Sequence, residues 1–121
     1  MASQIEDLLT ASLHRVFGER DAAVRRAAVD EIFAADVVFA DAEGVVRGRD
    51  ALSDKAGAIL DGAPGWVFRD AGPVREAQDL GVVEWAFGPA GEPPVVTGMD
   101  VAVVADGRIA TMHTLLTSPQ P

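Results

Sequence analysis

The chain has 121 residues and a formal net charge of -9, with 19 acidic against 10 basic side chains. This length fits a single domain with a core of its own. The acidic balance repels phosphate backbones and anionic membrane surfaces, so we expect no nucleic-acid and no membrane partner. The absence of cysteine excludes disulfides and thiolate metal sites.

The sequence also bears on metal binding and location. With only two histidines, His14 and His113, and no cysteine, the chain lacks the usual zinc ligands, so we expect no metal site. The first residues lack the basic start and the apolar run of a signal peptide. No stretch approaches the roughly 20 apolar residues of a membrane span. We therefore expect a cytoplasmic protein.

Three helices are predicted in the first half of the chain. Ser3 opens a capping-box pattern at the start of a helix that Gly18 ends. Asp21 caps a second helix, which closes in residues 34–36, and the pattern over 48–60 predicts a third. Apolar residues recur at helical spacing in each segment, so each helix has one face for the core.

Strands are predicted elsewhere. Residues 37–41 are rich in β-branched and aromatic side chains and lead into turn residues. After the third helix, segments separated by Gly, Pro or Asp predict an antiparallel meander over residues 66–69, 74–78, 82–87, 95–104 and 108–116. The pattern predicts one α+β domain over residues 1–117, with a curved, mostly antiparallel sheet around three N-terminal helices, and a tail over 118–121.

Asp100 is the most informative residue, because it lies in an apolar strand between Met99 and Val101 and shares a face with Ala102. Burying a carboxylate is costly unless partners compensate or the acid stays protonated. Either Asp100 faces water at a sheet edge, or it marks a site.

Asp41 is a second candidate, at the end of the strand over 37–41. It shares a strand face with Val37 and Phe39, so it points inward if Phe39 does. The alternative is a turn residue, because Asp is favoured where a strand runs into Ala42 and the turn that follows.

The register of the last hairpin decides whether His113 lies beside Asp100. A two-residue loop pairs Asp100 with His113 and places an imidazole beside the acid. A three-residue loop with Gly107 as the left-handed residue pairs Asp100 with Met112 and turns His113 to the opposite face. We favour the three-residue loop and keep His113, with His14 on the first helix, as alternative catalytic residues.

Three short motifs occur in a characteristic order: residues 32–39 (IFAADVVF) leading to Asp41, residues 48–52 (GRDAL) and residues 106–109 (DGRI). Together with the order of elements, they resemble the nuclear transport factor 2-like superfamily, which holds SnoaL-like polyketide cyclases and ketosteroid isomerases. The resemblance covers nearly the whole chain. It implies a cystatin-like cone that encloses an apolar pocket, a fold that hosts enzymes and binding modules alike.

The resemblance also implies roles for the two acids. Asp41 matches the general base of the ketosteroid isomerases, and Asp100 matches the acid that stays protonated and donates a hydrogen bond to a developing oxyanion. The chain departs from those isomerases in having no tyrosine, with Leu13 at the position of their phenol. Ala42 replaces a proline that often follows the base.

A pocket in such a cone is expected to have apolar and aromatic walls. Plain core is the competing interpretation for each aromatic residue. Trp85 alternates with Val83, so Glu84 lies on the other face of that strand. The residues expected to line the pocket are Leu13, Phe17, Phe39, Trp66, Trp85, Phe87, Met112, Thr114 and Leu116.

We therefore expect a small enzyme that isomerises, enolises or cyclises an apolar carbonyl compound by acid-base chemistry, without a metal or other cofactor. One alternative is an epoxide hydrolase or cyclase that uses two carboxylates. Others are a noncatalytic module that binds a hydrophobic ligand and a dimerisation module of the same fold. We also expect a homodimer through the sheet face that the helices leave uncovered.

Overall fold

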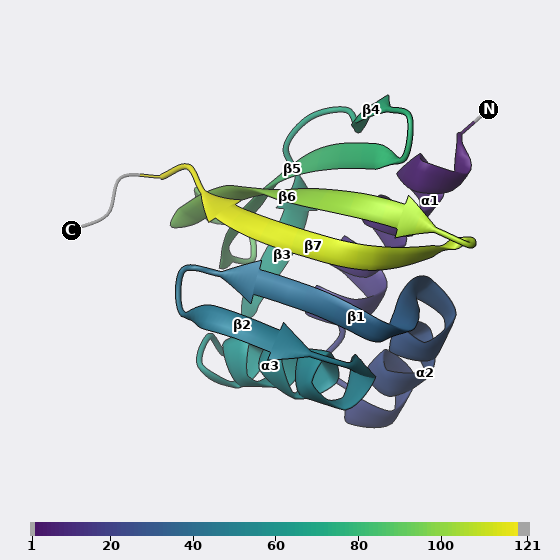
Figure 1. Cartoon of the computed structure of the whole chain (residues 1–121). Helices are drawn as coiled ribbons and strands as arrows, with labels where there is room; N and C mark the ends of the chain where they lie inside the picture. The colour runs from purple at the N-terminus through teal and green to yellow at the C-terminus, as the bar shows by residue number, and fades with distance from the viewer. Residues whose placement is uncertain (1, 119–121) are drawn as a thin grey trace.

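The computed structural model describes residues 2–118, in which helices pack on one side of a curved sheet (Figure 1). The helical segments are α1 (Gln4–Ala11), the π-helix η1 (Ser12–Phe17) that continues it, α2 (Ala22–Ile32) and α3 (Arg49–Asp61). The strands are β1 (Phe33–Asp41), β2 (Gly44–Arg47), β3 (Trp66–Asp70), β4 (Arg75–Ala77), β5 (Leu80–Pro89), β6 (Val96–Ala105) and β7 (Arg108–Leu116).

The seven strands form one sheet in the order β2-β1-β7-β6-β5-β3, and β4 pairs with β5. Neighbouring strands are antiparallel except β1 and β7, which run parallel. The meander β5-β6-β7 forms the centre of the sheet. This architecture confirms the predicted α+β class with a mostly antiparallel sheet.

The helices begin where their capping residues predict. Ser3 Oγ accepts a hydrogen bond from the Glu6 amide at 3.1 Å, and Asp21 Oδ1 accepts from two amides at the start of α2, each at 3.0 Å. The first helix extends to Phe17 before Gly18, as predicted, but its second half is wound as the π-helix η1. Such wider turns are rare and occur often near functional sites.

The predicted boundary between α2 and β1 is wrong. The helix ends at Ile32 rather than in residues 34–36, and β1 begins at Phe33 rather than at residue 37. Phe33 is fully buried and has an extended backbone. Its carbonyl accepts a hydrogen bond from Arg49 Nε at 2.9 Å, so contacts with the start of α3 override the local helix pattern. Strand β2 was not predicted.

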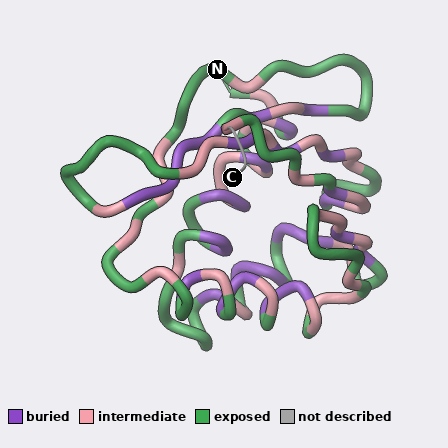
Figure 2. The backbone as a smooth tube through the Cα atoms, turned by 90° about the vertical axis from the view of Figure 1, so that its left-hand side faces the viewer, coloured by how far each residue is buried: buried purple, intermediate pink, exposed green. Residues whose placement is uncertain are grey.

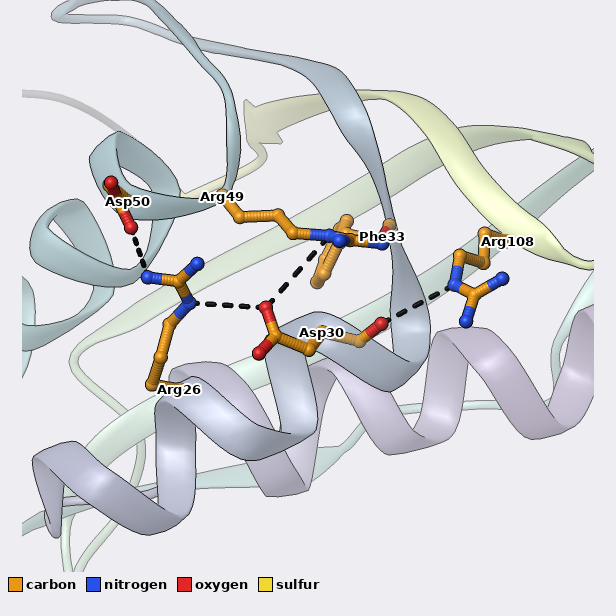
Figure 3. Close-up of polar contacts among 6 residues, drawn as sticks. All are labelled: Arg26, Asp30, Phe33, Arg49, Asp50 and Arg108. Atoms are coloured by element: carbon orange, nitrogen blue, oxygen red, sulfur yellow. Dashed lines mark hydrogen bonds and ion pairs between the residues drawn. The ribbon is translucent and has the colours of Figure 1, made fainter.

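A cluster of charged side chains joins the ends of α2, α3 and β7 (Figure 3). Arg26 pairs with Asp30 at 3.2 Å, one turn along α2, and with Asp50 in the first turn of α3. Arg108 Nε donates to the carbonyl of Asp30 at 3.3 Å. Exposed pairs of this kind each contribute little to the free energy of unfolding.

The β6-β7 hairpin turns through Asp106 and Gly107, and Ala105 pairs with Arg108. Both turn residues have positive φ, 54° and 78°, as a two-residue type I′ turn requires. The prediction of a three-residue loop is therefore wrong. Asp tolerates the left-handed region better than most residues. The turn accordingly places Asp106, and not Ala105, at positive φ.

A β-bulge next to this turn sets the register of the two central strands. The pairing shifts by one residue, because Ala110 has no partner on β6. Asp100 consequently pairs with Thr114, and neither of the two predicted partners, His113 and Met112, stands opposite it. The bulge keeps Met112 buried on the inner face and leaves His113 exposed on the outer face.

The core lies between the helices and the sheet. In Figure 2 the buried stretches run along the facing sides of both layers, and the exposed stretches lie mainly in loops. A smaller cluster of Leu13, Leu60, Trp85 and Phe87 packs beside the main core. Among residues 2–118, no helix has the length and apolar composition needed to cross a membrane.

Candidate functional site

A small cavity of about 40 Å³ lies inside the cone. Five apolar side chains from two helical segments and two strands line it, together with two polar side chains. Its lining residues are Leu13, Phe17, Ile59, Phe68, Trp85, Asp100 and Thr114. A mostly apolar hollow with a few convergent polar groups is the usual form of a small-molecule site.

A wider hollow of about 230 Å³ adjoins this cavity. It is lined by Asp41, Ala42, Glu43, Ile59, Thr114 and Leu116. Because Ile59 and Thr114 line both spaces, the wider hollow forms a mouth in front of the cavity. Asp41 lines the wider hollow and Asp100 lines the cavity, so the two predicted acids border adjoining spaces.

The carboxyl group of Asp100 is held by side chains of the two neighbouring strands. Its Oδ1 accepts hydrogen bonds from the Trp85 indole Nε1 on β5 at 3.0 Å and from the Thr114 hydroxyl on β7 at 2.7 Å. The residue is 3% exposed. The acid is therefore buried with partners, and the sheet-edge alternative does not hold.

Burial raises the pKa of Asp100 from 3.8 to about 6, while the hydrogen bonds from Thr114 and Trp85 act in the opposite direction because they stabilise the carboxylate. Its second oxygen, Oδ2, has no hydrogen-bond partner among residues 2–118. The fully enclosed polar side-chain atoms without a partner in this region are Ser12 Oγ, Arg25 Nε and Arg69 Nε. Oδ2 is not one of them, and Asp100 itself lines the cavity.

Asp41 is held at the end of β1 by three contacts. Its Oδ1 accepts hydrogen bonds from the amides of Glu43 at 2.9 Å and Gly44 at 3.2 Å, which form the turn into β2. Its Oδ2 lies 3.0 Å from Lys55 Nζ on α3. Asp41 thus combines the turn role and the inward position that the sequence left open.

Lys55 is the one basic residue in contact with the acids of the mouth among the described residues. It bridges Glu43 at 2.5 Å and Asp41, and its side chain is only 16% exposed. The hydrogen bond to Glu43, followed by that to Asp41, raises the pKa of Lys55 above its ordinary 10.5. The ammonium therefore stays charged near neutral pH and places a positive charge beside Asp41.

The residues expected to line the pocket divide into two groups. Leu13, Phe17, Trp85 and Thr114 line the cavity, and Leu116 lines the mouth. The remaining four, Phe39, Trp66, Phe87 and Met112, line neither space; the first, third and fourth are buried, and Trp66 is half-buried against Phe87. For those four, plain core packing is the better description.

Sequence reasoning missed Ile59, Phe68 and Lys55. Ile59 on α3 lines both the cavity and its mouth. Phe68 stacks on Phe87 with ring centroids 4.0 Å apart and also meets Trp85 edge-on. A charged residue on a helix usually indicates a solvated face, so only the proximity of α3 to Asp41 reveals Lys55.

The two histidines lie away from the cavity. His113 is exposed on the outer face of β7, opposite to Asp100. His14 lies on η1, where its Nε2 is 2.8 Å from Asp70 Oδ1, and its side chain is 41% exposed. Neither lines the cavity or its mouth, so the hypothesis of an imidazole beside Asp100 is not supported.

Known proteins of the same shape are numerous. A SnoaL-like family protein from Agrobacterium tumefaciens, provisionally named an isomerase, has a TM-score of 0.89 at 21% identity over 97% of this chain and 100% of its own. A protein from Sinorhizobium meliloti, provisionally named a polyketide cyclase, has a TM-score of 0.70 at 21% identity, covering 93% and 99%. A protein of cystatin-like fold from Methylobium petroleophilum reaches 0.75 at 18%, covering 98% and 78%.

These likenesses establish the cystatin-like α+β fold, and their low identities leave the chemistry open. No curated protein matches the sequence significantly. The family model of the SnoaL-like domain, by contrast, matches residues 9–112, which is most of the chain. The motifs at residues 32–39, 48–52 and 106–109 all fall within that match. The chain therefore belongs to the SnoaL-like domain family.

Proposed function

We propose that the protein binds a small, apolar carbonyl compound in the cavity and catalyses its enolisation or isomerisation by acid-base chemistry. The observation that carries this proposal is the second oxygen of Asp100. Asp100 lines an apolar cavity, and its first oxygen is occupied by two donors, which leaves the second for a ligand. A protonated carboxyl in that position is a hydrogen-bond donor for a ligand oxygen in surroundings that exclude water.

The reaction needs a base as well as a donor, and Asp41 at the mouth is the candidate. Its carboxylate removes a proton from the carbon beside the carbonyl group, and the C–H electron pair forms a carbon–carbon double bond. The carbonyl π electrons move to oxygen, where Asp100 Oδ2–H donates. Return of the proton to the same carbon regenerates the ketone, and its return to a conjugated carbon gives the isomer.

Lys55 fits this division of labour. It places a positive charge 3.0 Å from Asp41 Oδ2, whereas burial raises the pKa of Asp100 to about 6. Paired acids with separated protonation states are the usual arrangement when one carboxyl must accept a proton and the other must donate a hydrogen bond. No tyrosine is present to help Asp100, so this mechanism relies on a single donor at the ligand oxygen.

Binding without catalysis is the second candidate, and the contacts of Asp41 favour it. A carboxylate has about four lone-pair sites, and three in Asp41 are occupied by two amides and the Lys55 ammonium. Asp41 could therefore serve only to shape the mouth. The variant Asp41→Asn distinguishes catalysis from binding alone. It abolishes turnover if Asp41 is the base, and it leaves ligand binding unchanged under either function.

The experiment uses 2-cyclohexenone, a ring ketone of seven heavy atoms, as the probe. NMR in D₂O follows its binding and the exchange of its acidic C–H protons for deuterium. We expect the wild-type protein to accelerate this exchange. The variants Asp41→Asn and Asp100→Leu should lose the acceleration. The control variant Asp79→Asn, changed at an exposed position, should keep it. Binding without accelerated exchange would leave the noncatalytic function, and no binding would reject both.

We also propose that two copies associate through the outer face of the sheet. Met99 and Val101 on β6 are half-buried there, and Leu115 on β7 is 51% exposed. This face lies opposite the helices (Figure 1). Sedimentation velocity of the wild-type chain should show a dimer that Val101→Glu converts to a monomer; a wild-type monomer at all concentrations would reject the proposal.

A further inference from the structure

The side chains that contact the carboxyl group of Asp100 have a function of their own. Three residues of the two flanking strands and of β6 itself determine which oxygen of the carboxyl group a ligand meets. They are Trp85 on β5, Gly98 on β6 and Thr114 on β7. The first and third hydrogen-bond to Asp100, and Gly98 shapes the path of the indole.

Gly98 makes room for the indole ring. Trp85 pairs directly with Gly98 across β5 and β6, and a Cβ on Gly98 would lie 2.3 Å from Trp85 Cζ2 and 2.7 Å from Cη2. The ring therefore lies over the bare Cα of Gly98. From there it reaches along β6 to Asp100, two residues farther on the same face, and places Nε1 at 3.0 Å from Oδ1.

Thr114 approaches the same oxygen from the other side. It stands opposite Asp100 because the bulge at Ala110 shifts the register, and its hydroxyl lies 2.7 Å from Oδ1. The indole N–H of Trp85 can only donate a hydrogen bond. Oδ1 therefore accepts this bond and does not direct a carboxyl proton toward Trp85. The acidic proton is thus favoured on Oδ2, the oxygen that neither donor contacts.

We propose that Trp85 and Thr114, with Gly98 as the spacer, are positioning residues that hold Oδ1 of Asp100 as the fixed acceptor and present Oδ2–H to the ligand. The ligand class that matches is a neutral molecule whose oxygen accepts a hydrogen bond, such as a ketone. The choice of ligand rests on the proposed function; the positioning does not.

The first test needs no ligand. The titration of Asp100 is followed through its side-chain ¹³C carboxyl signal in the wild type and in Thr114→Val, which removes the hydroxyl and keeps the shape. We expect the midpoint to rise by about one pH unit, a tenfold weaker acid, and Trp85→Phe to act in the same direction. Thr117→Val, which removes an exposed hydroxyl that bonds to Thr97, is the control. An unchanged midpoint in Thr114→Val would overturn the proposal.

The second test uses Asp100→Asn, because an amide has the donor and acceptor that a protonated carboxyl has. With Oδ1 between the same two donors, the NH₂ group must face the cavity at every pH. This variant should bind 2-cyclohexenone about tenfold more tightly than the wild type at pH 7 and equally at pH 5, since only about a tenth of Asp100 is protonated at pH 7.

The outcomes separate the two proposals. If the wild type binds the ketone but Asp100→Asn binds it no better than Asp100→Leu does, the amide donor does not face the ligand and the positioning is wrong. If the midpoint of Thr114→Val rises but no variant binds the ketone, the positioning stands and the carbonyl-binding function is rejected. Trp66→Phe, which removes a half-buried indole outside the cavity, should behave as the wild type in both tests.

Discussion

Replacing Asp100 by asparagine should make the protein more stable above neutral pH and should remove one pH-dependent contribution to its free energy of unfolding. The pKa of Asp100 is about 6 in the folded chain and 3.8 in the unfolded reference. Folding therefore favours the protonated acid. The stabilisation from this proton is complete below pH 3.8 and is lost as the pH rises through 6.

The magnitude follows from the difference between the two pKa values. At 1.36 kcal/mol per pH unit, a rise from 3.8 to about 6 corresponds to about 3 kcal/mol. An asparagine in the same place keeps the hydrogen bonds from Trp85 and Thr114 and does not ionise. The difference in free energy of unfolding, Asp100→Asn minus wild type, should thus increase by about 2 kcal/mol between pH 4 and pH 8, because part of the change already lies below pH 4.

Urea unfolding of both proteins at several pH values measures this difference, and comparison with the wild type cancels the titration of the other acids. Asp79→Asn, a matched change at an exposed position, should show less than about 0.5 kcal/mol of such dependence. If the difference in free energy of unfolding between Asp100→Asn and the wild type stays constant from pH 4 to pH 8, the reasoning is refuted. Burial would then not raise the pKa of Asp100.

Two further variants test the mouth. Lys55→Met removes the ammonium between Asp41 and Glu43. This change should lower the free energy of unfolding by about 1 kcal/mol, and Lys55→Arg should restore it. An unchanged urea midpoint in Lys55→Met would mean that these ion pairs contribute nothing to stability. Ile59→Trp should narrow the passage between mouth and cavity and weaken 2-cyclohexenone binding by at least about tenfold; unchanged affinity would show that the ketone does not pass Ile59.

Much of the fold could be predicted because its signals are local. Ser3 and Asp21 cap their helices through side-chain hydrogen bonds that the sequence pattern anticipates. Alternation in β5 correctly separated the buried Trp85 from the exposed Glu84. The start of β1 at Phe33 could not be predicted, because a hydrogen bond from Arg49, distant in sequence, decides it.

The site was harder to predict, because it depends on register. The bulge at Ala110 has no sequence signature, yet it places Thr114 rather than His113 or Met112 opposite Asp100. A one-residue shift exchanges every side chain between the faces of a strand. The family resemblance placed Met112 and Thr114 inward, and both point inward, although only Thr114 lines the cavity.

The pH dependence of 2-cyclohexenone binding tests the central claim most directly, because it asks whether the proton of Asp100 meets the ligand oxygen. NMR titrations from pH 5 to pH 8 should show an affinity that is constant below pH 6 and falls tenfold per pH unit above it, about 90-fold in all. Asp100→Asn should bind equally at every pH. An affinity of the wild type that stays constant across this range, or rises with pH, would contradict the account.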